Sequence, residues 1–210
     1  MDFDTFHPNT LERLEQTKLI NGIVVPRPIA WVSTIGSAGA NLAPYSYFNM
    51  LSVEPPVLMF SVSIPFSARA GSVKDTLQNL EEVPEFVVHL VDYDLVEQMN
   101  ESSAEHPRGE SEFKLAGLTE LPSTMVRPPR IAEANVHMEC TLQDIIDIGK
   151  VPYRVVLGEV VAVHTRKGIV NDRYHVNQDI HRPIGRLGGA SQYATTKDRF
   201  ELKNSHIKPG

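Results

Sequence analysis

The chain has 210 residues, of which 41% are hydrophobic and 22% are charged, and its formal net charge at pH 7 is −6. This length is enough for one medium-sized domain with a substantial apolar core. The acidic balance, and the scatter of the lysines and arginines along the chain, argue against a protein that binds nucleic acid.

Cys140 is the only cysteine, which excludes an intramolecular disulfide and favours a reducing compartment. It lies in an apolar run, so we expect a buried, unreactive thiol. The N-terminal residues lack the features of a signal peptide, and no apolar stretch approaches the ~20 residues needed to span a bilayer. We therefore expect a cytoplasmic protein that does not bind membranes.

The first part of the chain is dominated by short runs of β-branched, aromatic and other apolar residues, which are typical of strands. Residues 20–25 form a first run of this kind, which Pro26 and Pro28 interrupt. A hairpin turn is predicted at residues 36–39, where two glycines flank Ser and Ala. Strands are predicted at residues 29–35, 41–51, 57–63 and 86–91.

Helical signals are fewer. Residues 72–75 resemble a capping box, which predicts a helix over residues 76–82. A second short helix is predicted at residues 94–102. Residues 105–114 are polar and contain Pro107 and Gly109, so we expect a long loop of the kind that often carries function.

The second half of the chain contains two long apolar runs, at residues 134–148 and 153–164, that predict strands. A close turn is predicted at residues 185–189, and a short helix or strand at 196–202. Sequential strands with short connections pair antiparallel. We expect a mainly β protein, a β-barrel with a few helices, that forms a single domain over residues 1–210 with its core at about 20–202.

Common catalytic motifs are missing from the sequence. It contains no dinucleotide-binding G-x-G-x-x-G after a strand, no P-loop and no G-x-S-x-G elbow. His175 and His181 flank Asp179, but their spacing matches no standard metal-ligand motif, so no metal site is predicted. His89 and His137 lie in apolar strands and are interpreted as core residues. If the protein is an enzyme, a bound cofactor is expected to carry the chemistry.

Polar side chains stand among apolar neighbours in the segment from Arg27 to Asn49. Buried hydroxyl and amide groups cost free energy unless they find partners. Ser33, Ser46 and Asn49 could satisfy one another across the hairpin, or they could line a cleft for a ligand rich in hydrogen-bonding groups. The residues alone leave both interpretations open.

A second polar segment runs from Ser67 to Thr76, at the start of a predicted helix. Helix N-termini favour anions, and Arg69 and Lys74 could bind phosphate oxygens there. The alternative is an ordinary capped helix with solvated charges.

Taken in this order, the segments resemble the flavin reductase-like, FMN-binding split-barrel family, in its flavoredoxin-like branch. The resemblance runs from about Gly22 to Leu202, and one departure is the turn at residues 36–40, which lacks the acidic residues that such turns often carry in the family. The matching stretches are residues 27–34 (RPIAWVST), 41–46 (NLAPYS), 55–56, 74–76 (KDT), 85–88, 99–100, 112–113, 116–119, 158–161 and 186–189 (RLGG).

The resemblance implies an antiparallel, Greek-key split barrel that binds FMN non-covalently at its rim, near a homodimer interface. It implies that the hairpin residues lie beside the ring and the ribityl chain, that Ser67, Lys74 and Thr76 hold the phosphate, and that residues 186–189 close over the site. No protein side chain is implied as a catalytic group. The implied cofactor-binding residues are Arg27, Trp31, Ser33, Thr34, Asn41, Ala43, Pro44, Tyr45, Ser46, Asn49, Ser61, Val62, Ser63, Ser67, Lys74, Thr76, Arg186, Leu187, Gly188 and Gly189.

The predicted function is an NAD(P)H-dependent flavin reductase, in which hydride passes from the nicotinamide to bound FMN and then to a second acceptor. A partner monooxygenase or another redox protein is one such acceptor. The alternative is a non-catalytic, flavoredoxin-like electron carrier that a partner protein reduces, and a third interpretation is a barrel that has lost FMN. The sequence specifies neither the final acceptor nor the choice between NADH and NADPH.

Overall fold

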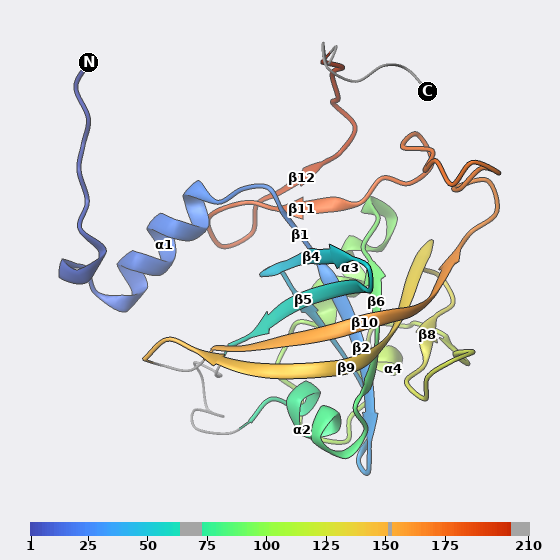
Figure 1. The fold of residues 1–210 in the computed structure, drawn as a ribbon. Helices are drawn as coiled ribbons and strands as arrows, with labels where there is room; N and C mark the ends of the chain where they lie inside the picture. The colour runs from blue at the N-terminus through green and yellow to red at the C-terminus, as the bar shows by residue number, and fades with distance from the viewer. Residues whose placement is uncertain (64–72, 151–152, 203–210) are drawn as a thin grey trace.

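The computed structural model describes residues 1–63, 73–150 and 153–202 (Figure 1). Its main feature is a seven-stranded antiparallel sheet with the strand order β3-β2-β6-β9-β10-β5-β4. The prediction of a mainly β, antiparallel fold is confirmed. The strands of this sheet are β2 (Ala30–Gly36), β3 (Gly39–Tyr45), β4 (Phe48–Val53), β5 (Pro56–Val62), β6 (Glu85–Leu90), β9 (Val136–Ile148) and β10 (Tyr153–Thr165).

Two smaller sheets complete the β structure. In one, β1 pairs with β11, so that Arg27 stands opposite Arg186, and β11 also pairs with β12. In the other, β7 pairs with β8. Their bounds are β1 (Arg27–Pro28), β11 (Ile184–Arg186), β12 (Tyr193–Thr195), β7 (Glu120–Leu121) and β8 (Arg130–Ile131).

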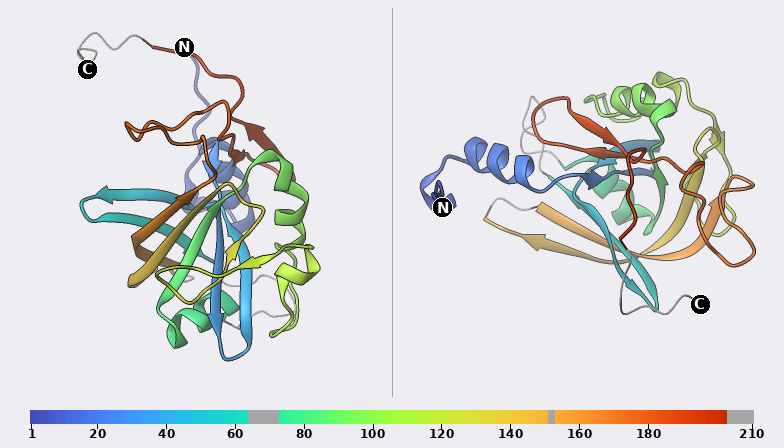
Figure 2. Two further views of the ribbon diagram at one scale, coloured as in Figure 1. Left: turned by 90° about the vertical axis from the view of Figure 1, so that its right-hand side faces the viewer. Right: turned by 90° about the horizontal axis from the view of Figure 1, so that it is seen from above.

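The main sheet curves into a barrel (Figure 2). Strands β3 and β4 form its two opposite edges, yet only Ser46 and Tyr47 separate them in the chain. The link from Tyr45 to Phe48 spans at most about 11 Å, so the two edges must approach each other. The Ser61 N–H also donates a hydrogen bond of 2.8 Å to the Tyr47 carbonyl oxygen. Ser46 and Tyr47 therefore lie at the seam of the barrel.

Alternate residues of strand β2, which lies between β3 and β6, point into two separate apolar clusters, as the period of a strand requires. Ala30 and Val32 belong to the cluster inside the barrel. Trp31 belongs to a second cluster, together with residues of α3 (Val96–Glu101) and α4 (Glu112–Leu115). Cys140 is fully buried in the barrel interior, as predicted.

Two of the predicted helices are present. The helix α2 (Asp75–Glu82) matches the prediction, but its N-cap residue is Lys74, whose side chain makes no capping hydrogen bond. The structure places the N-cap at Lys74, whereas Ser72, the first residue of the predicted capping box, lies outside the described residues. The second helix appears as a 3-10 turn at Tyr93–Leu95 followed by α3.

Two predictions about local structure are wrong. The helix α4 occupies the end of the segment expected to be a loop, because the carboxylate of Glu112 bonds to β3 and anchors the helix there. Residues 196–202 form neither a helix nor a strand. The last strand instead ends at Thr195, where its pairing with β11 ends.

The N-terminal helix α1 (Arg13–Ile23) replaces the expected apolar β-type run at residues 20–25. It begins with a reciprocal capping box between Glu12 and Glu15, which favours helix over strand. The helix extends away from the barrel (Figure 1), and none of its residues is fully buried. Leu14 and Ile23 expose 63% and 67% of their surface. Among the described residues, no helix is long and apolar enough to cross a membrane.

His89, His137 and His164 stand opposite one another on β6, β9 and β10. The Nδ1 atom of His89 lies 2.8 Å from the Trp31 carbonyl oxygen, and its Nε2 accepts the Ile131 N–H at 3.0 Å. Both bonds are satisfied only by the neutral ring with its hydrogen on Nδ1. Burial lowers the pKa of His89 to about 3. His89 and His137 are buried, as predicted for core residues.

Candidate functional site

A cavity of about 300 Å³ opens at the seam of the barrel. We call it the basic cavity. Its walls come from α1, β1, the link between β3 and β4, the end of β5, the residue before α2, and from β10 and β11. The lining residues are Thr17, Asn21, Arg27, Pro44, Tyr45, Ser46, Tyr47, Ser61, Ser63, Lys74, Tyr153, Arg186 and Gly189.

The charges around this cavity are all positive. Arg27, Lys74 and Arg186 line it, and none of its described lining residues is Asp or Glu. The Nε atom of Arg27 and the Nη1 atom of Arg186 are buried and have no hydrogen-bond partner among the described residues. Buried N–H groups normally have partners, so these two guanidinium groups mark a place where an acceptor, and preferably an anion, fits.

Arg27 holds the rim of the basic cavity together. Its Nη1 donates to the carbonyl oxygens of Asn21 and Val24, both at 2.7 Å, and its Nη2 donates to that of Leu187 at 3.1 Å. One side chain therefore ties the end of α1 to the hairpin that follows β11. Burial lowers the pKa of Lys74, while the nearby carboxylate of Glu105 opposes this shift.

Two tyrosines form an aromatic wall. The rings of Tyr47 and Tyr153 stack with their centroids 5.9 Å apart. The Tyr47 hydroxyl donates to the Asn21 side-chain oxygen at 2.6 Å, and the Arg27 guanidinium lies 6.0 Å from the Tyr47 ring centroid. Flat rings beside cations suit a planar, partly anionic ligand.

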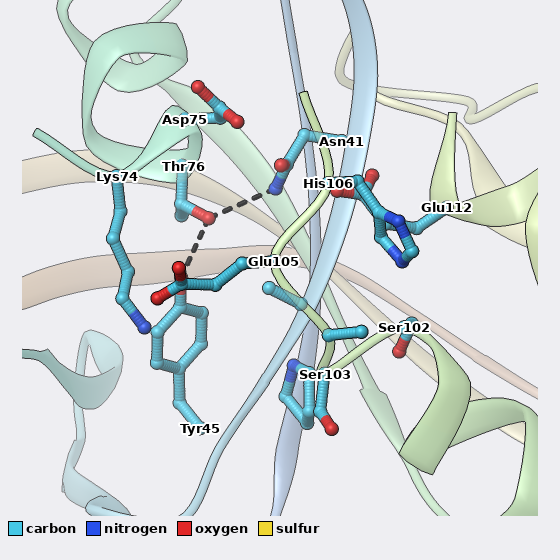
Figure 3. Close-up of a pocket in the computed structure, with 13 residues that line it drawn as sticks. Asn41, Tyr45, Lys74, Asp75, Thr76, Ser102, Ser103, Glu105, His106 and Glu112 are labelled. Carbon is cyan, nitrogen blue, oxygen red and sulfur yellow. Dashed lines mark hydrogen bonds between the residues drawn. The ribbon is translucent and has the colours of Figure 1, made fainter. Parts of the chain in front are cut away.

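A second cavity of about 90 Å³, which we call the acidic cavity, lies at the start of α2 (Figure 3). It shares Pro44, Tyr45 and Lys74 with the basic cavity. Its charged lining consists of three carboxylates and Lys74, and a histidine also lines it. Its lining residues are Asn41, Ala43, Pro44, Tyr45, Lys74, Asp75, Thr76, Ser102, Ser103, Ala104, Glu105, His106 and Glu112.

Hydrogen bonds fix the polar groups of the acidic cavity. Thr76 Oγ1 bonds to the Tyr45 hydroxyl at 2.7 Å and to Asn41 Nδ2 at 3.0 Å. The Leu42 N–H donates to the Glu112 carboxylate at 3.0 Å. Burial raises the pKa of Glu112 and also that of Tyr45.

The structure brings many of the predicted site residues together. Nine of them line the basic cavity and three others line only the acidic cavity. The first group is Arg27, Pro44, Tyr45, Ser46, Ser61, Ser63, Lys74, Arg186 and Gly189, and the second is Asn41, Ala43 and Thr76.

Four predicted residues from β2 and β5 line neither cavity, because their side chains are buried inside the fold. The Trp31 Nε1 donates to the Ser102 hydroxyl at 2.9 Å, and the Ser33 hydroxyl donates to the Pro129 carbonyl oxygen at 2.5 Å. Thr34 accepts a bond from Asn79, and Val62 belongs to the barrel core. Ser33 thus has a partner inside the fold, but that partner is neither Ser46 nor Asn49.

The remaining predicted residues also lie outside the two cavities. Asn49 is exposed on β4, where its side-chain oxygen accepts the Met50 N–H. Leu187 takes part through its carbonyl oxygen, which accepts from Arg27. Ser67, with Arg69 beside it, lies outside the described residues.

Gly188 lines neither cavity. A Cβ at this position would lie 2.8 Å from the Cα of Gly22. The glycine therefore allows the hairpin after β11 to pass close to the end of α1, and the close approach is between two backbones of the protein.

Sequence reasoning missed several lining residues. Thr17 and Asn21 lie on the unpredicted helix α1, and Tyr153 lies on a distant strand. The sequence offers a signal for Tyr47, because it stands two residues after the predicted site residue Tyr45, and side chains two residues apart in an extended chain point to the same side. Among the described residues, no group of three or more His, Cys, Asp or Glu side chains could hold a metal ion. His181 instead lies 3.8 Å from Asp92.

Comparison with known proteins adds a family and close structural relatives. A family model for the flavin reductase-like domain matches residues 23–182. A protein of Aquifex aeolicus is 43% identical over 173 residues, which cover 82% of this chain and 86% of the relative. Nitrilotriacetate monooxygenase component B from Bacillus cereus has a solved structure that superposes with a TM-score of 0.90 at 36% identity, covering 96% of this chain and all of the other.

A second solved structure is similarly close. It is the 2-nitrobenzoate 2-nitroreductase of Pseudomonas fluorescens, with a TM-score of 0.87, 35% identity and 99% coverage of both chains. The family model spans most of the barrel and reaches from α1 to the segment before β11. The chain therefore belongs to the flavin reductase-like family that its motifs predicted.

Proposed function

We propose that the protein binds FMN in the basic cavity, that a nicotinamide nucleotide reduces the bound flavin, and that the electrons then pass to a second acceptor. The observation that carries this proposal is a cavity whose described lining has three cations and no carboxylate, with two buried guanidinium N–H groups that have no partner in the described part of the chain.

The residues of this cavity fit FMN. Its volume of about 300 Å³ is at the lower end of the range for ligand pockets. FMN combines an anionic phosphate with a flat ring whose reduced form carries negative charge. Arg27, Lys74 and Arg186 supply the compensating charge, and the Tyr47 and Tyr153 rings supply an apolar wall.

Bound FMN would supply hydride acceptance at its N5 atom and electron transfer to the next acceptor. The chain itself would orient the ring and stabilise negative charge. Arg27 and Arg186 are held in place by backbone carbonyl oxygens, so they need no rearrangement as charge develops. The hydroxyls of Ser46, Ser61 and Ser63 would bind polar edges of the cofactor.

We further propose that the protein acts as a homodimer. An isolated helix of about 11 residues is marginal in water, and α1 buries none of its residues fully. Its exposed Leu14, Ile20 and Ile23 are explained if a second copy covers them. Since Thr17 and Asn21 line the basic cavity from the same helix, this contact would also enclose the site. Sedimentation analysis of the wild type and of Ile23→Glu tests this, and a monomeric wild type contradicts it.

The proposed function is tested by titrating FMN into the purified protein, followed by anaerobic addition of NADH or NADPH. We expect tight FMN binding and bleaching of the flavin spectrum by one of the nucleotides. Bound flavin that neither nucleotide bleaches would favour the electron-carrier alternative, and a protein that takes up no FMN contradicts the proposal. The name of the Bacillus cereus relative, a monooxygenase component, supports a monooxygenase as one acceptor to include.

A further inference from the structure

We propose that the acidic cavity receives the carboxamide group of the nicotinamide nucleotide. This inference rests on the proposed function and assigns a subsite to its co-substrate. Three features of the cavity carry it: a spare hydroxyl donor, carboxylate acceptors, and a wall shared with the basic cavity.

The first feature is a hydroxyl hydrogen without an acceptor. Tyr45 and Thr76 each carry one hydroxyl hydrogen, and a single hydrogen bond of 2.7 Å joins their oxygens. Asn41 Nδ2 donates to Thr76 Oγ1 and uses no hydroxyl hydrogen (Figure 3). Whichever way the shared bond runs, one hydroxyl hydrogen has no acceptor among the described residues.

This spare donor is deeply buried. Tyr45 and Thr76 expose 6% and 1% of their surface, and both line the acidic cavity. A buried donor without a partner costs free energy, and a ligand oxygen that enters the cavity would remove this cost.

The second feature is the set of carboxylates. Glu112 is buried and accepts the Leu42 N–H at 3.0 Å. A carboxylate has about four acceptor positions, so Glu112 retains capacity for a donor from a ligand. Glu105 lines the same cavity. The acidic side of the cavity therefore selects ligand groups that donate hydrogen bonds, and repels phosphates and carboxylates.

A carboxamide matches both features at once. It presents a carbonyl oxygen that accepts and, beside it, an NH₂ group that donates. The cavity volume of about 90 Å³ is far below the range for whole cofactors and suits a small head group. Because Pro44 and Tyr45 line both cavities, a carboxamide here would leave the attached ring beside the flavin cavity.

The test compares three nucleotides that differ only at this group. They are NAD⁺, its 3-acetylpyridine analogue, in which CH₃ replaces NH₂, and its nicotinic acid analogue, in which O⁻ replaces NH₂. Calorimetry on the FMN-loaded protein measures the Kd of each oxidised nucleotide, so that differences in reduction potential do not enter. We expect binding weaker by about 10-fold for the acetylpyridine analogue and about 100-fold for the nicotinic acid analogue.

A matched pair of variants locates the effect. Glu112→Gln keeps an acceptor for the Leu42 N–H but removes the charge, so we expect the preference for NAD⁺ over the nicotinic acid analogue to shrink by about fivefold or more. Glu120→Gln changes the same chemical group on the exposed strand β7. We expect this variant to keep the wild-type preference for NAD⁺ over the nicotinic acid analogue.

The outcomes separate this inference from the proposed function. Equal Kd values for the three nucleotides on the wild type, with NADH still bleaching the flavin, would overturn the carboxamide subsite and leave the proposed function standing. An unchanged preference in Glu112→Gln would also overturn it. If no nicotinamide nucleotide binds or bleaches the flavin, both proposals fail.

Discussion

The basic and acidic cavities share a wall of Pro44, Tyr45 and Lys74, yet their chemistry is opposite. The basic cavity combines three cations with an aromatic wall, whereas the acidic cavity gathers three carboxylates around buried hydroxyl and amide groups. Two neighbouring sites of opposite charge can hold two ligands without competition between them. This difference is what separates the flavin from the nicotinamide in our proposals, and the following experiments test it.

The largest effect is expected from Arg27→Ala. The change removes a buried guanidinium from the basic cavity and three hydrogen bonds from its rim, so we expect FMN to bind about 100-fold more weakly. Fluorescence titration of FMN measures this. Arg27→Lys keeps the charge but loses the forked geometry, so its affinity for FMN should fall by about tenfold. Arg173→Ala, on the exposed surface, should bind FMN with wild-type affinity. Wild-type affinity in Arg27→Ala would contradict the assignment of the flavin to this cavity.

A smaller effect, about tenfold, is expected from Lys74→Gln, since one cation of three is lost. Burial holds the pKa of Lys74 below its usual range. The ammonium therefore loses its proton at a lower pH than an ordinary lysine, and FMN affinity should fall as the pH rises through this pKa. Titrations of FMN from pH 7 to 10 measure the decline, and Lys74→Arg should remove it. A pH-independent affinity in the wild type would exclude Lys74 as a partner of the anion.

Gly188→Ala should weaken FMN binding by a few fold. The added Cβ would lie 2.8 Å from the backbone of Gly22, so the hairpin and the end of α1 must separate, and the rim of the basic cavity opens. Gly22→Ala is the matched control, because a Cβ there meets nothing within 4 Å and alanine favours the helix. Thermal unfolding and FMN titration of both variants check the prediction. Equal stability and equal FMN affinity of the two variants would show that the close approach of the hairpin to α1 does not shape the site.

The smallest effect on either cavity is expected from a substitution of His89, because this residue lines neither cavity. Because its pKa is about 3 when folded and about 6.5 when unfolded, the unfolded chain binds more protons between these values. The free energy of unfolding should therefore fall as the pH drops from about 6.5 towards 3. Denaturant unfolding at pH 7, 6 and 5 measures this slope, which should be shallower in His89→Asn. An identical slope in the variant would mean that other groups control the acid sensitivity.

Some elements of the fold are specified by residues that are close together in the sequence. The β-branched and aromatic residues at 29–35 and the glycines at 36 and 39 each specify their own conformation, and the structure has a strand and a hairpin turn there. The residues of the two polar segments left a ligand site open as one of two interpretations. The resemblance to a flavin-binding family then rested on the order of these short motifs, which the family model bears out.

Tertiary structure decided where each side chain points and which distant residues meet. Ser33 and Ser46 are equally polar in sequence, but β2 lies between two strands and buries Ser33 against Pro129, whereas Ser46 lies at the seam and lines the basic cavity. Arg27 and Arg186 meet only because β1 pairs with β11 across most of the chain. A strand's period fixes that neighbouring side chains point in opposite directions, but only closure of the barrel decides which direction faces a cavity.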